Sequence, residues 1–410
     1  MNCIFTICAK NYLAQALTLK ESALKHNNVD FFIILADSPT DDINDVNVIT
    51  LNESWIPEWQ SMAYKYNVIE FSTSVKPFVF QKLFNEGYDN VIYLDPDTYV
   101  TDKLDYLWEQ LQKYAIILTP HYNNIQTNYT GAVTEEELLF VGIYNLGFCA
   151  ISNSLVGNKI VEWWCSRLKD KCYADHEDAL HVDQRWMDFI PGFYPNDTLI
   201  CHHFGINVAI WNLHERELII RDGKYKVTDL STQKEYPLLL FHFSGFDPFN
   251  PTYINRRHPR FGVDSFPSFK SIIEEYRSLE YKNGYNKYSK FKYSFNFYED
   301  GTSILPLHRR LYRVAIAESP LLKSGSPFRI QHPFYQMLIK KNLIVKGFKK
   351  DFNLGARKQL KGEYNKIDAI IKKSALIVRR IIGLEKYYLL LRYFYKFSRL
   401  ENQYFLLRRK

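Results

Sequence analysis

The chain has 410 residues, of which 46% are hydrophobic and 24% are charged. These values are typical of a folded globular protein with one large or two moderate domains, and they exclude a wholly disordered chain. No run of about 18 consecutive apolar residues occurs, so we expect no helix that spans a membrane.

The net charge of +7 is unevenly distributed along the chain. Residues 340–410 contain 20 Lys and Arg against 5 Asp and Glu, whereas residues 1–339 contain 32 against 40. An acidic body followed by a basic tail predicts two functional parts with different partners.

The six cysteines do not follow a zinc-binding spacing, and a chain of this size does not need a disulfide framework. We therefore expect buried free thiols in a reducing compartment at Cys3, Cys8, Cys149, Cys165, Cys172 and Cys201. The N-terminus lacks the charged leader and long apolar core of a signal peptide, which also favours a cytoplasmic protein.

The first 120 residues alternate between short apolar runs and helical patterns. Strands are predicted at residues 3–9, 31–37, 46–51, 90–94 and 115–119, and helices at residues 12–26, 76–87 and 104–114. This alternation predicts a mostly parallel sheet covered by helices on both faces. Ligands of such sheets bind beyond the carboxyl ends of the strands, where Asp37 and Asp95 fall.

The rest of the chain is less regular. We predict a strand at residues 143–152, helices at 155–171 and 181–190, and a last buried strand at 236–243. Residues 251–330 are rich in Pro, Tyr, Lys and Asn and are expected to be largely irregular, and long basic helices are expected beyond 330. The predicted organisation is an α/β catalytic domain over 1–250, a connecting segment over 251–330 and a basic amphipathic helical tail over 331–410.

The most informative segment is Asp95-Pro96-Asp97, which follows the apolar strand at residues 90–94. Two carboxylates that emerge together at the tip of a buried strand can bind one divalent cation, Mn²⁺ or Mg²⁺. Such a cation keeps open positions for diphosphate oxygens and neutralises charge on a leaving group. The alternative is that these residues form an exposed acidic loop that binds no metal.

Two other functions compete at this point. An Asp-x-Asp pair after a strand also occurs in haloacid-dehalogenase-type phosphatases, in which Asp95 would be the nucleophile. In those proteins the pair follows the first strand of the chain, whereas here it follows the fourth predicted strand, with three others before that one. The other alternative is a protein that binds glycans or membranes without catalysis.

Several motifs in order resemble the GT-A-fold glycosyltransferases, in particular the retaining enzymes of glycosyltransferase family 8 and their bacterial relatives. The resemblance covers about residues 2–250, and its elements are the opening strand and loop from Thr6 to Tyr12, Lys76, Asp95 with Asp97, Asn145 with Gly147, Asp183-Gln184, and His242 with Gly245. It implies a Rossmann-like GT-A sheet with flanking helices. It also implies a metal held by Asp95, Asp97 and His242.

The resemblance further implies roles for the other matched residues. Asp183 and Gln184 are expected to be catalytic, with Asp183 stabilising the developing cation and Gln184 near the anomeric carbon. A nucleotide-sugar donor, with UDP as the nucleotide, is expected to bind at Thr6, Tyr12, Asp37, Lys76, Asn145, Gly147 and Gly245. The resemblance also implies transfer with retention to a saccharide or lipid-linked saccharide, and we expect a role in bacterial capsule or lipopolysaccharide synthesis.

One departure from the family concerns the cation near the diphosphate. The lysine that normally follows the histidine motif is missing, because the run here is Phe246-Asp247-Pro248. Its substitute is left open among Lys76, Arg216, Arg256 and Arg257. The run from His203 to Asn212 is interpreted as a polar and aromatic loop near substrate, with core packing of Trp211 as an equal alternative.

The basic tail combines cationic clusters with apolar and aromatic residues. At helical spacing, Ile377, Ile381, Leu384 and Tyr388 share one face. We favour an interfacial helix on anionic lipid, which places the protein on the inner face of the cytoplasmic membrane. A helix packed on the catalytic domain is the alternative, and no nucleic-acid partner is expected because no nucleic-acid-binding fold is recognisable.

Overall fold

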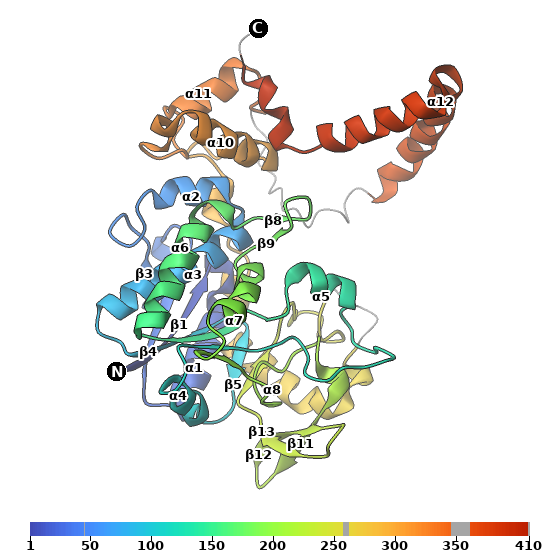
Figure 1. The fold of residues 1–410 in the computed structure, drawn as a ribbon. Helices are drawn as coiled ribbons and strands as arrows, with labels where there is room; N and C mark the ends of the chain where they lie inside the picture. The colour runs from blue at the N-terminus through green and yellow to red at the C-terminus, as the bar shows by residue number, and fades with distance from the viewer. Residues whose placement is uncertain (45, 257–261, 346–360, 409–410) are drawn as a thin grey trace. The chain divides into compact units, whose positions relative to one another are not determined.

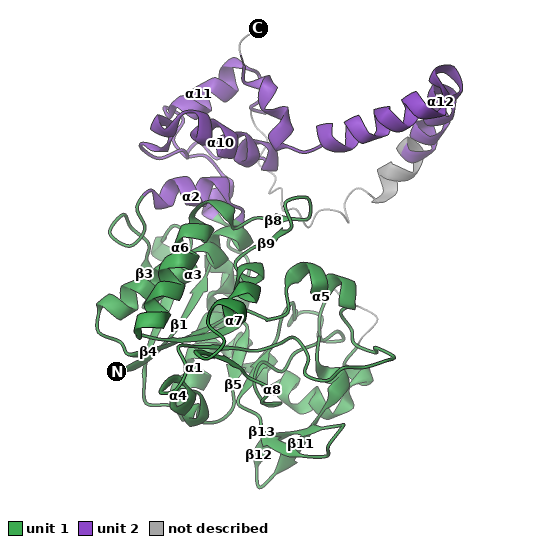
Figure 2. Cartoon of the chain, in the orientation of Figure 1, with its two compact units in different colours: residues 1–57, 68–293 green, residues 58–67, 294–410 purple. Residues whose placement is uncertain are grey.

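The computed structural model describes residues 1–44, 46–256, 262–345 and 361–408, with side chains of the last range from residue 368 onward. The chain forms two compact units (Figure 2). The first unit contains Met1–Pro57 and Val68–Tyr293, and the second contains Glu58–Asn67 and Ser294–Lys410. These limits do not coincide with residues 250 and 330, and the assignment of separate functions to the three predicted regions stays a prediction.

A seven-stranded sheet in the order β10-β6-β7-β4-β1-β2-β3 organises the first unit (Figure 1). Its strands run parallel except β7, which is antiparallel to β4 and β6. The strands are β1 (Asn2–Cys8), β2 (Asp30–Leu35), β3 (Ile49–Thr50), β4 (Asn90–Leu94), β6 (Ile116–Leu118), β7 (Phe148–Ser152) and β10 (Thr198–Ile200). The predicted α/β class with a mostly parallel sheet is confirmed.

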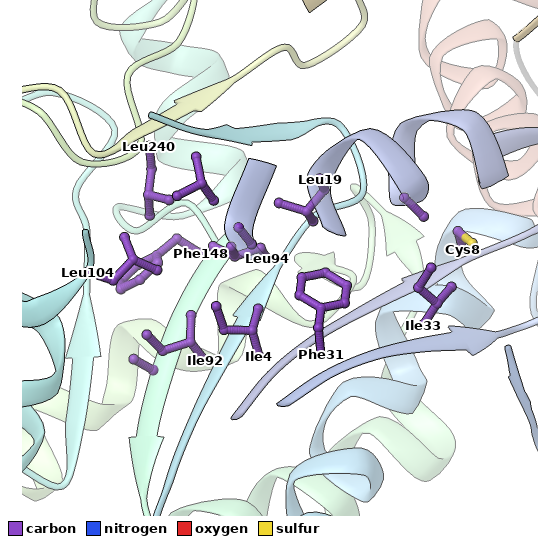
Figure 3. Packing of buried hydrophobic residues seen from close by; sticks show 14 of the residues in the cluster. Ile4, Cys8, Leu19, Phe31, Ile33, Ile92, Leu94, Leu104, Phe148 and Leu240 are labelled. Atoms are coloured by element: carbon purple, nitrogen blue, oxygen red, sulfur yellow. The ribbon is translucent and has the colours of Figure 1, made fainter. Parts of the chain in front are cut away.

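Helices bury both faces of this sheet, and successive side chains of each strand point alternately to the two faces. On one face, Ile4 and Ile92 pack with Leu19 of α1 (Leu13–His26), as Figure 3 shows. On the other, Phe5 contacts Phe80 of α3 (Val68–Asn85) at 5.0 Å between ring centroids. Helices α4 (Asp105–Leu111) and α6 (Leu155–Lys171) complete the two layers. The near-continuous apolar strands of the sequence therefore reflect helices on both sides.

Smaller elements of the first unit surround this sheet. The two-stranded sheets are β14 (Leu240–His242) with β5 (Thr98–Val100), and β8 (Ala174–Asp175) with β9 (Leu180–His181). A three-stranded sheet contains β11 (Arg216–Arg221), β12 (Lys224–Asp229) and β13 (Glu235–Pro237). The further helices are α5 (Glu135–Val141), α7 (Ile190–Phe193), α8 (Lys270–Lys282), α9 (Tyr285–Tyr288) and the 3-10 helices η1 (Lys10–Tyr12) and η3 (Gln184–Phe189).

The predicted helix over residues 76–87 begins too late. Helix α3 begins at Val68 and continues through Pro77. A proline is common at the first position of a helix, which is why the sequence pattern indicated a start there. Buried side chains on both sides of the proline, among them Phe71 and Val79, outweigh the missing backbone hydrogen bond.

Three predictions between residues 143 and 243 are wrong in extent. The strand of 143–152 begins only at Phe148, because the chain turns at Asn145–Gly147. The helix of 181–190 is instead the end of β9 followed by η3, since Val182 has a left-handed φ of 41°. The strand of 236–243 divides into β13 and β14 at Pro237, where the hydrogen-bonding partners change.

Residues 251–330, expected to be irregular, contain long helices. In the first unit, α8 buries Ile272, Ile273 and Tyr276 at helical spacing. In the second unit, α10 (Pro306–Glu318) buries Leu311 and Tyr312. The high Tyr and Lys content concealed these amphipathic patterns, because tyrosine rings contribute to the buried faces.

The second unit is helical. It contains α2 (Trp59–Lys65), α10, α11 (Pro333–Lys340), α12 (Lys361–Phe397) and the 3-10 helix η10 (Glu401–Leu406). The predicted helical tail is confirmed, but α12 is interrupted at Gly383, whose φ of 79° and ψ of 166° are not helical. The predicted face therefore does not continue from Ile381 to Leu384. Within the described part of the chain, none of the helices combines the length and apolar character that crossing a bilayer requires.

All six cysteines are free and buried, as predicted. Burial raises the pKa of each thiol, for example that of Cys201. The side chains therefore act as small apolar groups of the core.

A buried arginine holds the second unit together. The guanidinium of Arg309 on α10 donates to the backbone oxygens of Ala63, Tyr64 and Tyr66 at 3.1, 2.6 and 2.6 Å. It also donates to the backbone oxygen of Phe295 at 2.6 Å and to Oδ1 of Asn296 at 2.9 Å. One planar group thus joins three segments of this unit.

We expect Arg309→Lys to lower the free energy of unfolding of the second unit by about 3 kcal/mol, because an ammonium group cannot reach all five acceptors. Urea unfolding and calorimetry measure the change. Arg329→Lys, at an exposed position of the same unit, is the control and should change stability by less than about 0.5 kcal/mol. Equal effects of the two substitutions would contradict the role assigned to Arg309.

Candidate functional site

The acidic motif forms the turn between β4 and β5. The backbone N–H of Thr98 donates to the oxygen of Asp95 at 3.0 Å, and the N–H of Asp95 donates to the oxygen of Gly147 at 2.8 Å. Pro96 occupies the second position of this turn, where its fixed φ is favourable. The side chains of Asp95 and Asp97 remain 30% and 16% exposed, so both carboxylates are accessible from solvent.

Antiparallel pairing of β14 with β5 brings His242 to this turn. His242 lies opposite Thr98, and the N–H of Phe243 donates to the oxygen of Asp97 at 2.8 Å. As a result, Nε2 of His242 is 3.1 Å from Oδ1 of Asp97 and 3.6 Å from Oδ2 of Asp95. The structure therefore brings together the three predicted metal ligands.

These three side chains fit a divalent cation. Their candidate ligand atoms all lie within 4.8 Å of one another, and two carboxylates with one imidazole are a donor set that Mn²⁺ and Mg²⁺ accept. Burial lowers the pKa of His242, but the carboxylates of Asp97 and Asp95 outweigh burial and raise the pKa overall. A cation between these groups would replace the proton that the carboxylates otherwise attract.

A buried ion pair lies next to the triad. Nζ of Lys76 on α3 is 2.7 Å from Oδ2 of Asp183 and 3.8 Å from Oδ1 of Asp95, and it donates to the backbone oxygen of Leu146 at 2.8 Å. Burial raises the pKa of Asp183, and the charge of Lys76 opposes this shift. Together with Asp97, these groups comprise three carboxylates against one ammonium, and the two formal negative charges that remain would be balanced by one divalent cation.

Tyr93 connects this ion pair to the acidic turn. Its hydroxyl donates to Oδ1 of Asp95 at 2.5 Å, and Nζ of Lys76 lies 4.2 Å from the centre of its ring. The sequence analysis missed Tyr93 because it is one of several apolar residues of a buried strand. The signal available was its position two residues before Asp95, on the same side of the strand.

Asn145 and Gln184 form a network of amide groups beside the triad. The backbone N–H of Leu146 donates to Oε1 of Gln184 at 3.0 Å, and Nε2 of Gln184 donates to the oxygen of Val141 at 2.9 Å. Nδ2 of Asn145 lies 3.5 Å from Oε1 of Gln184. Predicted site residues from two distant segments thus meet here, while their catalytic and donor-binding roles stay predictions.

Gly147 allows the histidine to approach the main chain. A Cβ at this position would lie 2.2 Å from Cε1 and 2.5 Å from Nδ1 of His242. The structure places the imidazole ring of His242 against this glycine, and the donor-binding role expected of Gly147 stays a prediction. Any larger residue would displace His242 from Asp97.

The other predicted donor-binding residues lie in β1 and in the segments that follow β1, β2 and β14. Asp37 follows β2 and is 3.8 Å from Nζ of Lys10, and Tyr12 ends η1. Thr6 is fully buried within β1, and Gly245 lies in the turn after His242 with a φ of 71°. The donor-binding roles of these residues stay predictions.

The candidates for the missing diphosphate cation differ in surroundings. Lys76 and Arg216 are buried, and each is paired with a carboxylate, that of Asp183 or Glu215. Arg256 is exposed, and its backbone N–H donates to the oxygen of Gly245 at 3.1 Å. Arg257 lies outside the described residues.

A further buried acid, Glu280 of α8, was not expected from the sequence. Burial and, next, the charge of Asp97 raise the pKa of Glu280 to about 9. On the same helix, the ring of Tyr276 stacks on that of Phe243, with 3.8 Å between the ring centroids. The N–H of Phe243 donates to the backbone oxygen of Asp97, so this helix packs beside the acidic turn. A single glutamate on an amphipathic helix gives no sequence signal of this kind.

The raised pKa of Glu280 predicts how stability depends on pH. The folded protein keeps this proton up to about pH 9, whereas the unfolded chain releases it near the ordinary value of 4.5. Stability should therefore fall as pH rises between these values. We expect Glu280→Gln to unfold at a higher temperature than the native protein at about pH 8 and at a similar temperature at about pH 5.

Differential scanning calorimetry at both pH values measures this effect. Glu274→Gln, at an exposed position on the same helix, is the control and should show the pH dependence of the native protein. An unchanged pH dependence in Glu280→Gln would show that Glu280 titrates normally in the folded state.

Comparisons with known proteins place this site in context. The sequence matches no protein-family model, and no curated protein matches it. The structure is similar to solved glycosyltransferases. One is the galactosyltransferase LgtC in complex with donor and acceptor sugar analogues, with 15% identity, a TM-score of 0.42, and coverage of 69% of this chain and 96% of that chain.

Two further similar structures are also glycosyltransferases. GlyE of Streptococcus pneumoniae has 16% identity and a TM-score of 0.39, with 73% of this chain and 68% of that chain covered. Mouse xyloside xylosyltransferase 1 has 11% identity and a TM-score of 0.35, with 50% and 87% covered.

Proposed function

We propose that the protein is a metal-dependent glycosyltransferase that uses a nucleotide-sugar donor. The observation that supports this most is the convergence of Asp95, Asp97 and His242 at the carboxyl edge of the sheet. The two carboxylates are partly exposed, so a cation held there is open to a further ligand on its solvent side. A nucleoside diphosphate offers the oxygens that such a cation binds.

The chemistry requires a diphosphate leaving group to be stabilised. A bound Mn²⁺ or Mg²⁺ would neutralise the negative charge that develops on the diphosphate. Asp95, Asp97 and His242 would hold the cation, and Lys76 would balance the remaining carboxylate of Asp183. The buried pair of Lys76 and Asp183 is then neutral. The partly exposed carboxylates of Asp95 and Asp97 stay available for the cation and the donor.

We assign the sugar-contacting roles to Asn145, Asp183 and Gln184. Their polar groups lie within one hydrogen-bonded and ion-paired cluster next to Asp95. We assign to Asn145 the binding of sugar hydroxyls, to Gln184 a place near the anomeric carbon, and to the carboxylate of Asp183 the stabilisation of positive charge that develops on the sugar. Transfer with retention, a UDP-sugar donor and a role in bacterial surface polysaccharide synthesis follow from the family resemblance and belong to this proposal.

The phosphatase alternative receives less support. In haloacid-dehalogenase-type enzymes the acidic pair follows the first strand, whereas Asp95 follows β4. The imidazole of His242 also lies 3.1 Å from Asp97, which favours a shared cation over a nucleophilic carboxylate at Asp95.

Calorimetric titration of UDP and GDP, first with Mn²⁺ and then with EDTA, tests the proposal. We expect UDP to bind only with the metal. Asp97→Asn should remove metal-dependent binding and lower turnover about a hundredfold or more, because one ligand and one charge are lost. Asp105→Asn, at an exposed position of α4, is the control and should bind UDP normally. Near-normal activity of Asp97→Asn, or failure of both nucleotides to bind, would contradict the proposal.

We further propose that α12 binds an anionic membrane surface and so brings the enzyme to a lipid-linked acceptor. Large apolar side chains are exposed on both sides of Gly383, including Ile381 at 77% and Leu384 at 71%. The neighbouring basic side chains Lys372, Lys373, Arg379 and Arg380 are also exposed. Apolar and basic groups together match the interface of an anionic bilayer.

Co-sedimentation with vesicles of equal parts phosphatidylcholine and phosphatidylglycerol tests this partner. Reversal to glutamate at Lys372, Lys373, Arg379 and Arg380 should abolish binding, since each basic residue near the surface contributes about 1 kcal/mol. The matched control reverses exposed lysines of the first unit, Lys25, Lys103, Lys113 and Lys171. Equal binding by both variants would refute the role of α12.

A further inference from the structure

We propose that Asn207 is a positioning residue that holds the imidazole of His242 with its proton on Nδ1, so that Nε2 is free to bind the divalent cation. This inference rests on the metal site of the proposed function and assigns a role to a residue that is not one of the three ligands. The test below separates failure of the inference from failure of the metal site.

The backbone fixes Asn207 beside the histidine. Asn207 has a left-handed φ of 55° and is 2% exposed, and asparagine tolerates this conformation better than most residues. Nδ2 of Asn212 donates to its backbone oxygen at 3.1 Å. The following residue, Val208, accepts from the N–H of His242 at 2.7 Å. The loop that carries Asn207 is therefore attached to β14 by main-chain hydrogen bonds.

Main-chain groups also determine which way the amide of Asn207 points. The backbone N–H of Gly147 can only donate, and it lies 3.0 Å from Oδ1 of Asn145, so this oxygen is an acceptor. The group of Asn207 that faces it at 3.2 Å must be the donor, Nδ2. The same Nδ2 lies 3.5 Å from the backbone oxygen of Asn145, which can only accept. Oδ1 of Asn207 consequently points the other way.

The atom it faces is Nδ1 of His242, at 3.3 Å. Because an amide oxygen can only accept, Nδ1 must carry a proton in this contact. The second ring nitrogen, Nε2, faces Asp97 at 3.1 Å. A neutral imidazole protonated at Nδ1 has its lone pair on Nε2, which is the form that a metal requires.

The ring is also confined by packing. The rings of Trp211 and His242 are nearly perpendicular, with 5.2 Å between their centroids. The imidazole also lies against Gly147, where a Cβ would clash with it. Packing restrains the plane of the ring, but it does not distinguish one nitrogen from the other. The hydrogen bond to Asn207 supplies that distinction.

Two substitutions separate this role from a purely structural one. Asn207→Gly removes the side chain and keeps a residue that adopts the left-handed backbone. Asn207→Asp keeps an oxygen that accepts from Nδ1, but it loses the Nδ2 group that donates to Oγ1 of Thr119 at 2.9 Å and to Oδ1 of Asn145 at 3.2 Å. If the structural hydrogen bonds of Nδ2 mattered most, both variants would fail alike.

The first measurement is the Mn²⁺ affinity of the full chain, by calorimetry and by electron paramagnetic resonance. We expect Asn207→Gly to bind Mn²⁺ about ten- to a hundredfold more weakly and Asn207→Asp to stay within about threefold of the native protein. The control is Asn27→Gly, which removes another buried amide of the first unit, bonded to Leu104 and Ala23. It should lower stability and leave Mn²⁺ affinity unchanged.

The second measurement is the nitrogen NMR spectrum of ¹⁵N-histidine-labelled protein with Mg²⁺, with His242 assigned by its loss in His242→Gln. Native protein and Asn207→Asp should show a protonated Nδ1, and Asn207→Gly should show a mixture of tautomers. Native Mn²⁺ affinity in Asn207→Gly, or equal losses in both variants, would overturn the inference and leave the glycosyltransferase proposal intact. Absence of Mn²⁺ binding by the native protein would overturn both.

Discussion

The pairing of β14 with β5 is the constraint on which the candidate site depends. The acidic turn lies at the end of one strand of the main sheet, but two carboxylates alone do not make a selective metal site. Backbone hydrogen bonds between Thr98 and His242 place an imidazole against Asp97 from a segment far along the chain. Because strand pairing is rigid, the ligand set is formed before any ligand binds, which lowers the entropic cost of binding.

Charge balance explains how charged side chains beside the site can be buried. Asp183 would be costly without a partner in the interior, and Lys76 supplies that partner at 2.7 Å. The same ammonium lies 3.8 Å from Asp95, so one cation of the protein serves both the buried acid and the exposed turn. The net negative charge that remains lies toward solvent, at the three side chains that could hold a metal ion. A change at Lys76 would therefore affect folding and ligand binding together.

Hydrogen bonds among the amide side chains determine how those side chains and the ring of His242 are oriented. Main-chain N–H and carbonyl groups orient Gln184, Asn145 and then Asn207, and the last of these contacts His242. Each orientation is determined by a backbone group that has only one possible role in a hydrogen bond. The helical second unit exposes large apolar side chains on α12, which is the feature behind the membrane contact proposed for it.

The sequence by itself determined the alternation of strands and helices, the parallel sheet, the buried thiols and the basic helical tail. These features are set by local periodicity and by which residues follow a buried strand, as at Asp95 and Asp97. Tertiary structure alone decided that Val182 has a left-handed backbone where a helix was predicted, that the His242 ring lies against Gly147, and that Glu280 lies near Asp97. These relations join segments distant in sequence, and the packing and hydrogen bonds that create them leave no periodic pattern in the chain.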